Sequence, residues 1–348
     1  MKFWKIKFLP CFKLHLLILT VFCFEVKCFE IVKYEDVINF TNKTNLNLFL
    51  KNIKNNCQNA NFIKNISNHK SYPKFGSKED WQKICKKLKK KFPEKSEEFI
   101  EKNFMFATDF YSSGKLTGYY EPVIKISRVE KEPFIYPVLK YNNTLMKSRA
   151  EILGTYKSSD VIFWSDSNID IFFLQIQGSG IGILPDGGKV KLSYAGNNGY
   201  EYTSIGKLLV SEKEIEGKKI SLFSIKKWLK KNPKKIEKLF NRNKRYIFFR
   251  EEAYTSKNTK GAYGKELVNN LSIAIDKTFY PYGAPFYLET DSHEYNLFTI
   301  SHDTGSAIKG KNRADLFLGK GEKAEKIAGN LSKKLQLYIL MPYNQTYD

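Results

Sequence analysis

Arginine is scarce in this strongly basic sequence. The formal net charge at pH 7 is +22, yet only six of the 58 lysine and arginine residues are arginines. Proteins that bind nucleic acid favour arginine, because its forked guanidinium matches the geometry of phosphate and guanine. The shortage argues against a nucleic-acid partner, and the lysine excess is compatible with an anionic surface or polymer.

Motifs for metals and nucleotides are missing as well. The chain has five cysteines but no CxxC pair, and only four histidines, so no zinc site is predicted. The glycine run 178-GSGIGILPDGG-188 leads into a proline-containing turn, whereas a dinucleotide loop needs GxGxxG followed by a helix. We expect a hairpin at these residues, and neither a metal nor another cofactor.

The first 28 residues have the pattern of a targeting segment. Four lysines precede the apolar run 14-LHLLILTVFCF-24, and polar residues follow it. Eleven apolar residues suit the core of a signal peptide better than a membrane span. An uncleaved anchor, with the run extended by Phe8 and Leu9, is the alternative, and either interpretation predicts an exported protein.

Export changes the interpretation of the cysteines. Removal of the leader takes Cys11 and Cys23 and leaves Cys28, Cys57 and Cys85. Cys57 follows a helical pattern and Cys85 lies inside another. In an oxidising compartment these two could join neighbouring helices in a disulfide. Two free, buried thiols are the alternative.

The pattern of the chain changes near Leu116. Residues 30–110 read as short lysine-rich helices, and later residues read mainly as strands separated by turn signals. The run 171–184 is among the predicted strands, and 225–232, 234–243 and 322–335 are predicted helices. A mainly β protein with peripheral helices is expected, and no regular alternation of strand and helix supports a doubly wound sheet.

Two aspartates near the C-terminus are candidates for acid chemistry. Asp315 enters an apolar strand, where burial raises the pKa of a carboxyl group, and a nearby Asp303 would raise it further. A carboxylic acid that stays protonated near neutral pH can protonate a leaving-group oxygen. Lys309, Lys311 and Arg313 lie in the same stretch and oppose a calcium loop. The alternative is a turn-capping Asp315 that pairs with Arg313.

Aromatic and amide side chains gather in two motifs. Tyr194 and Asn198 lie in 193-SYAGNNGYEYTSIG-206, while Tyr119, Tyr120 and Gln177 lie in earlier segments. Aromatic faces with amide groups suit a sugar polymer, because sugar rings have apolar faces and many hydroxyls. Ordinary surface turns account for these residues equally well.

Six segments, in order, resemble the membrane-bound lytic murein transglycosylase A family. They are LTGYYEPVI, QGSGIGILPDGG, SYAGNNGYEYTSIGKLL, YIFFRE, IAIDKTFYPYGAP and HDTGSAIKGKNRADLFLG. The resemblance runs from about Leu116 to the C-terminus, and Asp276, Asp303 and Asp315 match the three aspartates of the family's C-terminal 3D region. The lipid-anchor signal of the family is missing, and His302 and Ser306 depart from its pattern.

The resemblance implies a fold. We expect a double-psi β-barrel built from residues 29–115 and 244–348, with the 3D region at about 272–341. A second β domain, residues 116–243, is expected as an insertion, and a substrate groove should lie between the two.

The resemblance also implies an activity. A lytic transglycosylase cleaves the β-1,4 bond between N-acetylmuramic acid and N-acetylglucosamine in peptidoglycan, as an exo- or endo-acting enzyme, and leaves a 1,6-anhydro end. Asp315 would be the single acid and base, with Asp303 and Asp276 shaping its environment. The residues expected to contact the glycan strand are Tyr119, Tyr120, Gln177, Tyr194, Asn198 and Lys309. The protein would lie in the bacterial periplasm or cell envelope, with residues 1–28 as a leader or membrane anchor.

Two other functions remain open at this point. A murein hydrolase ordinarily needs two carboxyl groups, and Glu121 or Asp303 could be the partner of Asp315. A catalytically silent protein that binds wall glycan is the other alternative.

Overall fold

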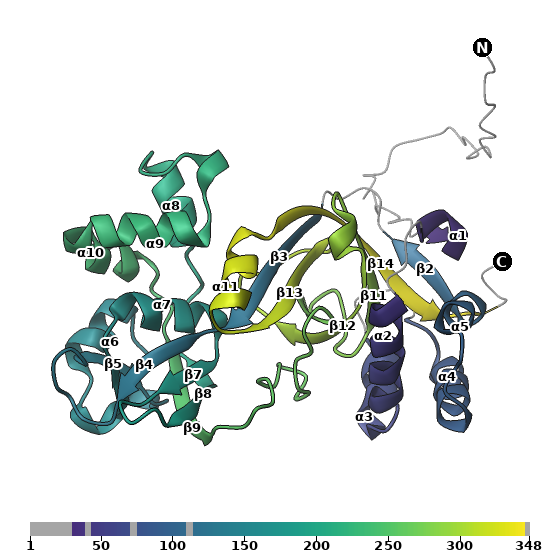
Figure 1. Cartoon of the computed structure of the whole chain (residues 1–348), viewed down its shortest axis with the longest axis horizontal. Coiled ribbons are helices and arrows are strands. Elements are labelled where there is room, and N and C mark those ends of the chain that lie inside the picture. Colours follow the sequence, from purple (N-terminus) through teal and green to yellow (C-terminus); the bar gives the residue numbers. More distant parts are fainter. Residues whose placement is uncertain (1–29, 39–42, 70–74, 109–113, 345–348) are drawn as a thin grey trace, which may run out of the picture.

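The computed structural model describes residues 30–38, 43–69, 75–108 and 114–344. The predicted leader, residues 1–28, lies outside the described residues. Within those ranges, no helix is both long enough and apolar enough to cross a bilayer. Figure 1 shows a barrel in the middle, a layer of helices on its right and a second sheet with its own helices on its left.

The barrel is a closed ring of six strands. Hydrogen bonds join the strands in the order β14-β11-β12-β10-β13-β3, and β3 pairs back with β14. The β10/β12 and β13/β3 pairs are parallel and the other pairs in the ring are antiparallel. Closure removes exposed strand edges, and it confirms the expected barrel. The strands are β3 (Gly114–Glu121), β10 (Ser272–Ile275), β11 (Pro285–Thr290), β12 (Leu297–Thr304), β13 (Arg313–Lys320) and β14 (Ser332–Pro342).

Strand β14 also ties the N-terminal part of the chain to the barrel. Its last residues pair with β2 (Phe104–Thr108), which pairs in turn with β1 (Glu30–Val32).

The core of the barrel is rich in aromatic rings. Phe106, Tyr287 and Phe298 are almost completely buried, with ring centroids 5.0–6.4 Å apart. Burial of such rings, at roughly 25 cal/mol per Å² of apolar surface, is the main stabilising contribution of this core.

A layer of helices covers one side of the barrel. In α4, Trp81, Ile84 and Leu88 recur at helical spacing and are buried, while the lysines between them face solvent. The layer consists of α1 (Tyr34–Val37), α2 (Lys43–Asn56), α3 (Ala60–Ser67), α4 (Lys78–Lys90) and α5 (Ser96–Asn103).

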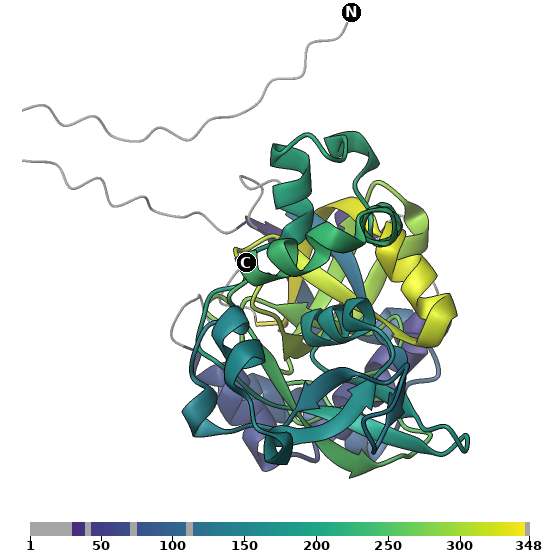
Figure 2. The same ribbon diagram turned by 90° about the vertical axis from the view of Figure 1, so that its left-hand side faces the viewer.

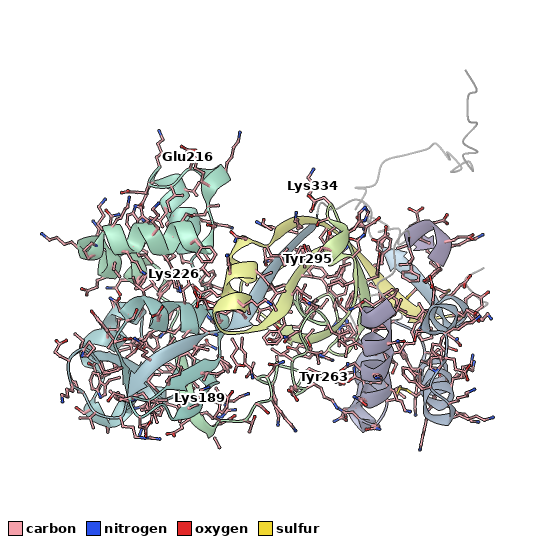
Figure 3. The ribbon with its side chains drawn as sticks, viewed as in Figure 1. Lys189, Glu216, Lys226, Tyr263, Tyr295 and Lys334 are labelled. Carbon is pink, nitrogen blue, oxygen red and sulfur yellow. A yellow bond between two sulfur atoms is a disulfide. The ribbon has the colours of Figure 1, made fainter. Side chains whose placement is uncertain are left out.

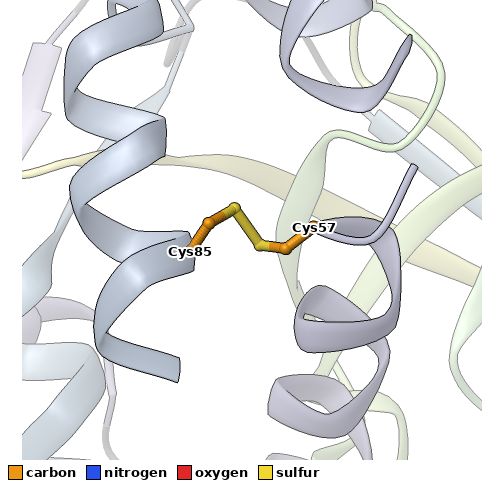
Figure 4. Close-up of a disulfide and its surroundings, with 2 residues drawn as sticks. All are labelled: Cys57 and Cys85. Carbon is orange, nitrogen blue, oxygen red and sulfur yellow. A yellow bond between two sulfur atoms is a disulfide. The ribbon is translucent and has the colours of Figure 1, made fainter. Parts of the chain in front are cut away.

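A disulfide crosses this layer. Cys57, directly after α2, is bonded to Cys85 of α4, with an S–S distance of 2.03 Å and Cα atoms 5.5 Å apart (Figure 4). This is the pair proposed from the sequence, and it joins two helices that the oxidised chain holds side by side.

The second sheet has six strands in the order β5-β6-β4-β7-β8-β9. Its core includes Ile126, Phe163, Leu192 and Phe249. The strands are β4 (Val123–Ser127), β5 (Tyr136–Leu139), β6 (Val161–Ser165), β7 (Gly180–Ile183), β8 (Lys189–Asn197) and β9 (Ile247–Ala253). The mainly β architecture with a second sheet and peripheral helices is therefore confirmed.

Helices surround the second sheet and link it to the barrel. Figure 2 looks at this end, where the green helices α8, α9 and α10 stand above the sheet. Lys226 of α9, which is labelled in Figure 3, forms an ion pair at 2.6 Å with Glu325 of α11, the helix that packs on the barrel. The α-helices are α6 (Arg149–Thr155), α7 (Asn168–Gln177), α8 (Ile205–Ser211), α9 (Leu222–Lys231), α10 (Ile236–Arg242) and α11 (Gly321–Asn330). The 3-10 turns are η1 (Asn143–Leu145), η2 (Ser158–Asp160), η3 (Gly217–Lys219), η4 (Pro233–Lys235) and η5 (His293–Tyr295).

The prediction of a strand over 171–184 was wrong in its first half. Helix α7 occupies that half, capped by Ser167 at its start and ended by Gly178 in the left-handed region. The helix is apolar on several sides because Leu174 packs in the sheet core while Phe172 packs against α8–α10. A helix buried in this way shows no polar face, so its sequence looks like a buried strand.

The glycine run after α7 forms the predicted hairpin. Strands β7 and β8 pair antiparallel, and Leu184 N–H donates to the Gly188 carbonyl at the tip. A side chain at Gly182 would meet Ile126 of β4 at 2.3 Å. Glycine at this position therefore allows β7 to pack closely against β4.

The strand pairings differ slightly from the expected domain limits of 116 and 243. Strand β3 belongs to the barrel and β4 to the second sheet, so the LTGYYEPVI segment is divided at Pro122. At the other end, β9 pairs with β8 of the second sheet. The inserted strands thus run from Val123 to Ala253.

Candidate active site

A cavity of about 930 Å³ lies between the barrel and the second sheet. Asp303, Asp315 and Tyr119 line it from the barrel, while Gln177 and Tyr194 line it from the second sheet and α7. We call this cavity the groove. Its walls come from segments that are far apart in the sequence.

Strand register places the two aspartates in one row. Ala274 of β10 is paired with Asp303 of β12 on one side and with Asp315 of β13 on the other. Asp315 is paired in turn with Thr117 of β3. Since paired residues in a sheet direct their side chains to the same face, these four side chains share one face. Ala274 itself is 3% exposed and packs with Tyr119 and Phe317.

Alternation along the strands directs that row toward the groove. Ala314 and Leu316, the neighbours of Asp315, are fully buried in the barrel core, as are Ile273 and Ile275 beside Ala274. Successive residues of a strand point to opposite faces. The row between them must therefore face away from the core.

Asp315 has one hydrogen-bonded oxygen and one open oxygen. Its Oδ1 accepts a hydrogen bond from the Thr117 hydroxyl, which itself accepts one from Arg313 Nη2 at 2.8 Å. Among the residues described, Oδ2 has no hydrogen-bond partner. Burial raises the pKa of this carboxyl group above its usual value of 3.8, against the opposing effects of the Arg313 charge and the Thr117 hydroxyl.

Asp303 is held by three donors. Its Oδ1 accepts from the backbone N–H groups of Ala262 and Thr304, both at 2.9 Å, and its Oδ2 accepts from the Tyr119 hydroxyl at 3.1 Å. Burial raises its pKa, the three donors lower it, and the neighbouring Asp315 charge raises it. The pKa values of both carboxyl groups are therefore raised, and Asp303 is held by three donors whereas Asp315 is held by one.

The third aspartate lies apart from this pair. Asp276 does not line the groove. Its carboxylate accepts from Gly310 N–H at 2.9 Å and from the backbone and hydroxyl of Thr278 at 3.0 and 2.8 Å. Burial acts to raise its pKa, but these donors and the Lys309 charge lower it below the usual value. Asp276 is therefore an ionised anchor for the loop that leads into β13.

The predicted glycan-contacting residues divide into two groups. Tyr119, Tyr120, Gln177 and Tyr194 line the groove. Burial and the two aspartates raise the pKa of Tyr119 well above its usual value, so it remains a hydrogen-bond donor. Gln177 Oε1 accepts from the Tyr120 backbone N–H at 3.0 Å, which holds the end of α7 against β3.

Asn198 and Lys309, also predicted to contact glycan, do not line the groove. Asn198 is buried and its amide donates to the carbonyls of Lys147 and Lys244 at 2.7 and 2.8 Å. Lys309 is exposed on the loop that Asp276 anchors. Both residues lie in motifs whose other members line the groove, but the side chain of Asn198 is bonded to backbone carbonyls and Lys309 follows the lining residues 304–308.

Glu121 is a further carboxyl group in the groove. It is 1% exposed, and the nearest cation is Lys191 Nζ at 3.9 Å. Burial raises its pKa, while the charges of Lys191 and Lys320 lower it. Glu121 is thus a further carboxyl group on the groove wall, with both carboxylate oxygens buried.

Several residues of the site were missed by sequence reasoning. Thr117 could have been found, because it lies two residues before Tyr119 on the same strand and so shares its face. Ala274 carried no signal, since its importance comes from the two strands beside it. Arg149 and Arg245 line the groove, but they lie outside the quoted motifs. Within the described ranges, no group of three or more His, Cys, Asp or Glu side chains is placed to hold a metal ion.

Comparison with known proteins identifies the family. Residues 141–250 match the MltA specific insert domain and residues 271–341 match the 3D domain. A membrane-bound lytic murein transglycosylase A homolog of Buchnera aphidicola subsp. Schizaphis graminum is 32% identical over 344 residues, covering 90% of this chain and 92% of the homolog. The chain belongs to the membrane-bound lytic murein transglycosylase A family. The resemblance inferred from six sequence segments is therefore confirmed.

Solved structures of the MltA family share this fold. A membrane-bound lytic murein transglycosylase from Agrobacterium tumefaciens is 22% identical with a TM-score of 0.77, covering 90% of this chain and 97% of that one. Escherichia coli MltA with bound chitohexaose is 25% identical with a TM-score of 0.71, covering 91% and 95%. The MltA insert match contains Gln177 and Tyr194, and the 3D match contains all three aspartates, so both matched segments supply walls of the groove.

Proposed function

We propose that this protein is a lytic transglycosylase of peptidoglycan. It cleaves the β-1,4 bond between N-acetylmuramic acid and N-acetylglucosamine and leaves a 1,6-anhydromuramic acid end. The observation that carries the proposal is the row of Asp303, Ala274 and Asp315 on the groove wall. Family membership supports it, and so does the chitohexaose bound to the Escherichia coli relative.

Asp315 is the acid and then the base. Its protonated carboxyl group gives a proton to the glycosidic oxygen as the bond to C1 of muramic acid breaks. The C6 hydroxyl of the same sugar then bonds to C1, and its proton returns to the Asp315 carboxylate. No water is consumed, so a single carboxyl group completes the cycle.

Asp303 supports the reaction as a fixed carboxylate. Its three donors hold the negative charge in place. A negative charge beside Asp315 favours the protonated form of Asp315 at the start of the cycle, and it stabilises positive charge that develops on the sugar ring. Asp276 supports the site indirectly, through the loop that it anchors.

The glycan strand lies along Tyr119, Tyr120, Gln177 and Tyr194. Their rings and amide groups match the faces and hydroxyls of the sugars. Holding the C6 hydroxyl near C1 is an orientation task, which a groove with rigid walls performs by removing rotational freedom before the reaction.

We further propose where the protein acts and how it is divided. The relatives are named membrane-bound, which supports a location in the cell envelope, and the leader pattern of residues 1–28 supports export to the periplasm with or without an anchor. The two sheets form two domains, a barrel domain and an inserted domain, with the groove between them.

Product analysis tests the proposal. Purified sacculi are digested in ¹⁸O-labelled water, and the fragments are identified by mass spectrometry. We expect anhydro ends without label. Labelled reducing ends would instead establish the hydrolase, with Glu121 or Asp303 as the second carboxyl group. An absence of fragments with the folded protein would leave only glycan binding.

A further inference from the structure

Two arginines on the groove wall have no acidic partner. Arg149 and Arg245 both line the groove, and within the described part of the chain neither forms an ion pair. Two other cations of the groove are matched, since Lys191 lies 3.9 Å from Glu121 and Arg250 lies 2.8 Å from Glu252. The two unmatched arginines are in contact through the main chain, because Arg149 Nη2 donates to the backbone carbonyl of Arg245 at 2.7 Å.

Arg149 is a buried cation. It is 4% exposed and opens α6, at the helix end where a positive charge is unfavourable. Its Nε donates to the Asn243 carbonyl at 3.0 Å, and its guanidinium lies over the rings of Phe172 and Tyr246 at 4.8 and 5.1 Å. Burial lowers its pKa to about 10, so the group is still charged at neutral pH.

Donor capacity remains on both side chains. Nη1 of Arg149 has no hydrogen-bond partner among the described residues, and Arg245 uses Nη1 on the Tyr200 carbonyl at 2.8 Å. Carbonyls and rings solvate a cation but do not neutralise it, and a buried charge without a counter-charge is costly. A ligand carboxylate would supply the missing counter-charge, because a guanidinium group with free N–H donors binds a carboxylate through charge-assisted hydrogen bonds.

We propose that Arg149 and Arg245 form a carboxylate-binding subsite of the groove, and that its ligand is a carboxylate of the peptide stem carried by muramic acid. This inference rests on the proposed function, which makes murein the substrate. The subsite gives the protein a preference for glycan that carries peptide stems. It lies on the inserted domain, opposite the aspartates of the barrel, so a strand between them is held from both sides.

Three substrates distinguish the effect of the peptide stem's charge from the effect of its size. They are murein glycan with peptide stems, the same glycan after its stem carboxylates are converted to amides, and glycan freed of its stems by an amidase. We expect wild-type kcat/KM to be about tenfold higher on the first than on the other two, which corresponds to about 1.4 kcal/mol. Equal values on the charged and amidated glycan would overturn the inference.

Variants assign the preference to these side chains. Arg245→Gln should reduce the ratio between charged and amidated glycan to about one, whereas Arg242→Gln, an exposed arginine outside the groove, should leave it unchanged. Arg149→Lys keeps the charge but loses the fork, so the ratio should fall part of the way, with thermal unfolding as the check on folding. An Arg245→Gln protein that keeps the wild-type ratio would overturn the inference.

A binding measurement distinguishes this failure from a failure of the proposed function. Calorimetric titration of the Asp315→Asn protein with stem-bearing glycan needs no turnover, and Arg245→Gln in that background should raise Kd about tenfold. If the wild-type protein cleaves none of the three glycans but this effect is present, the proposed activity fails and the subsite stands. If cleavage occurs and Kd is unaffected, only the subsite fails.

Discussion

Replacing Asp315 with asparagine changes the chemistry of the groove while leaving its shape intact. The amide oxygen can still accept the hydrogen bond from Thr117, and the new NH₂ group takes the place of Oδ2, which has no partner among the described residues. A buried carboxyl group is lost, so the free energy of unfolding should stay within about 1 kcal/mol of wild type. The proton donor is removed completely.

The expected loss of rate follows from that difference. General acid catalysis contributes about 10²–10⁴-fold, so kcat should fall by that factor, or about 2.7–5.4 kcal/mol in the barrier. The assay is the rate of anhydro-end formation on purified sacculi, measured by mass spectrometry. A variant that retains more than a tenth of the wild-type rate would remove Asp315 from the chemistry.

Asp276→Asn is the matched control. Asp276 accepts three hydrogen bonds outside the groove, and asparagine would turn an NH₂ group toward one of those donors. An unsatisfied buried donor costs about 1–3 kcal/mol, so urea unfolding should shift to lower concentration while kcat falls less than tenfold. Asp315→Asn should therefore lower the rate with little loss of stability, whereas Asp276→Asn should lower the stability with little loss of rate. The same loss of rate in both would contradict the separate roles of the two aspartates.

The structure makes three further predictions. Burial raises the pKa of Asp315 and Asp303 above 3.8, so the folded protein retains protons there that the unfolded chain releases. The free energy of unfolding should therefore fall as pH rises from 3.8 toward the raised pKa values. Denaturation curves of Asp315→Asn should show a weaker dependence on pH. The rate should fall over the same range, because the acid must be protonated. Ala274→Leu should crowd the two carboxyl groups beside it and lower kcat/KM at least tenfold with unchanged circular dichroism, whereas Ala274→Ser should retain activity; full activity of the leucine variant would contradict a role for this row in the reaction. Replacing Cys57 and Cys85 with serine should lower the free energy of unfolding by about 3–4 kcal/mol, from the loop of 28 residues that the bond closes, with little change in kcat; an unchanged unfolding midpoint would show that the bond does not form.

Much of the fold could be predicted because local patterns and global structure agree. Strand patterns and turn residues indicated a mainly β protein, and the family resemblance of the ordered motifs implied a barrel with an inserted sheet. The structure confirms both. One exception is the helix expected over 322–335, which ends at Asn330 and gives way to β14 at Ser332. The other is α7, whose apolar residues are buried against both the sheet and α8–α10. No polar face remained to reveal a helix.

The groove was harder to predict than the fold. Asp303, Asp315, the tyrosines and Gln177 were named from the sequence, but Asp276, Asn198 and Lys309 were named with them and lie outside the groove. A polar motif shows that a loop is exposed and not which way it turns. The roles of the named residues remain predictions until the variants are measured.

The chain alone determined the family, the chemistry available to it and the residue types that perform it. The sequence placed the Asp315 carboxyl group at the start of an apolar strand, where burial raises its pKa. Only the tertiary structure decided which groups meet. Alternation along a strand fixes the face of each side chain, but the row of Asp303, Ala274, Asp315 and Thr117 depends on pairing among four strands, and that register is set by closure of the whole barrel.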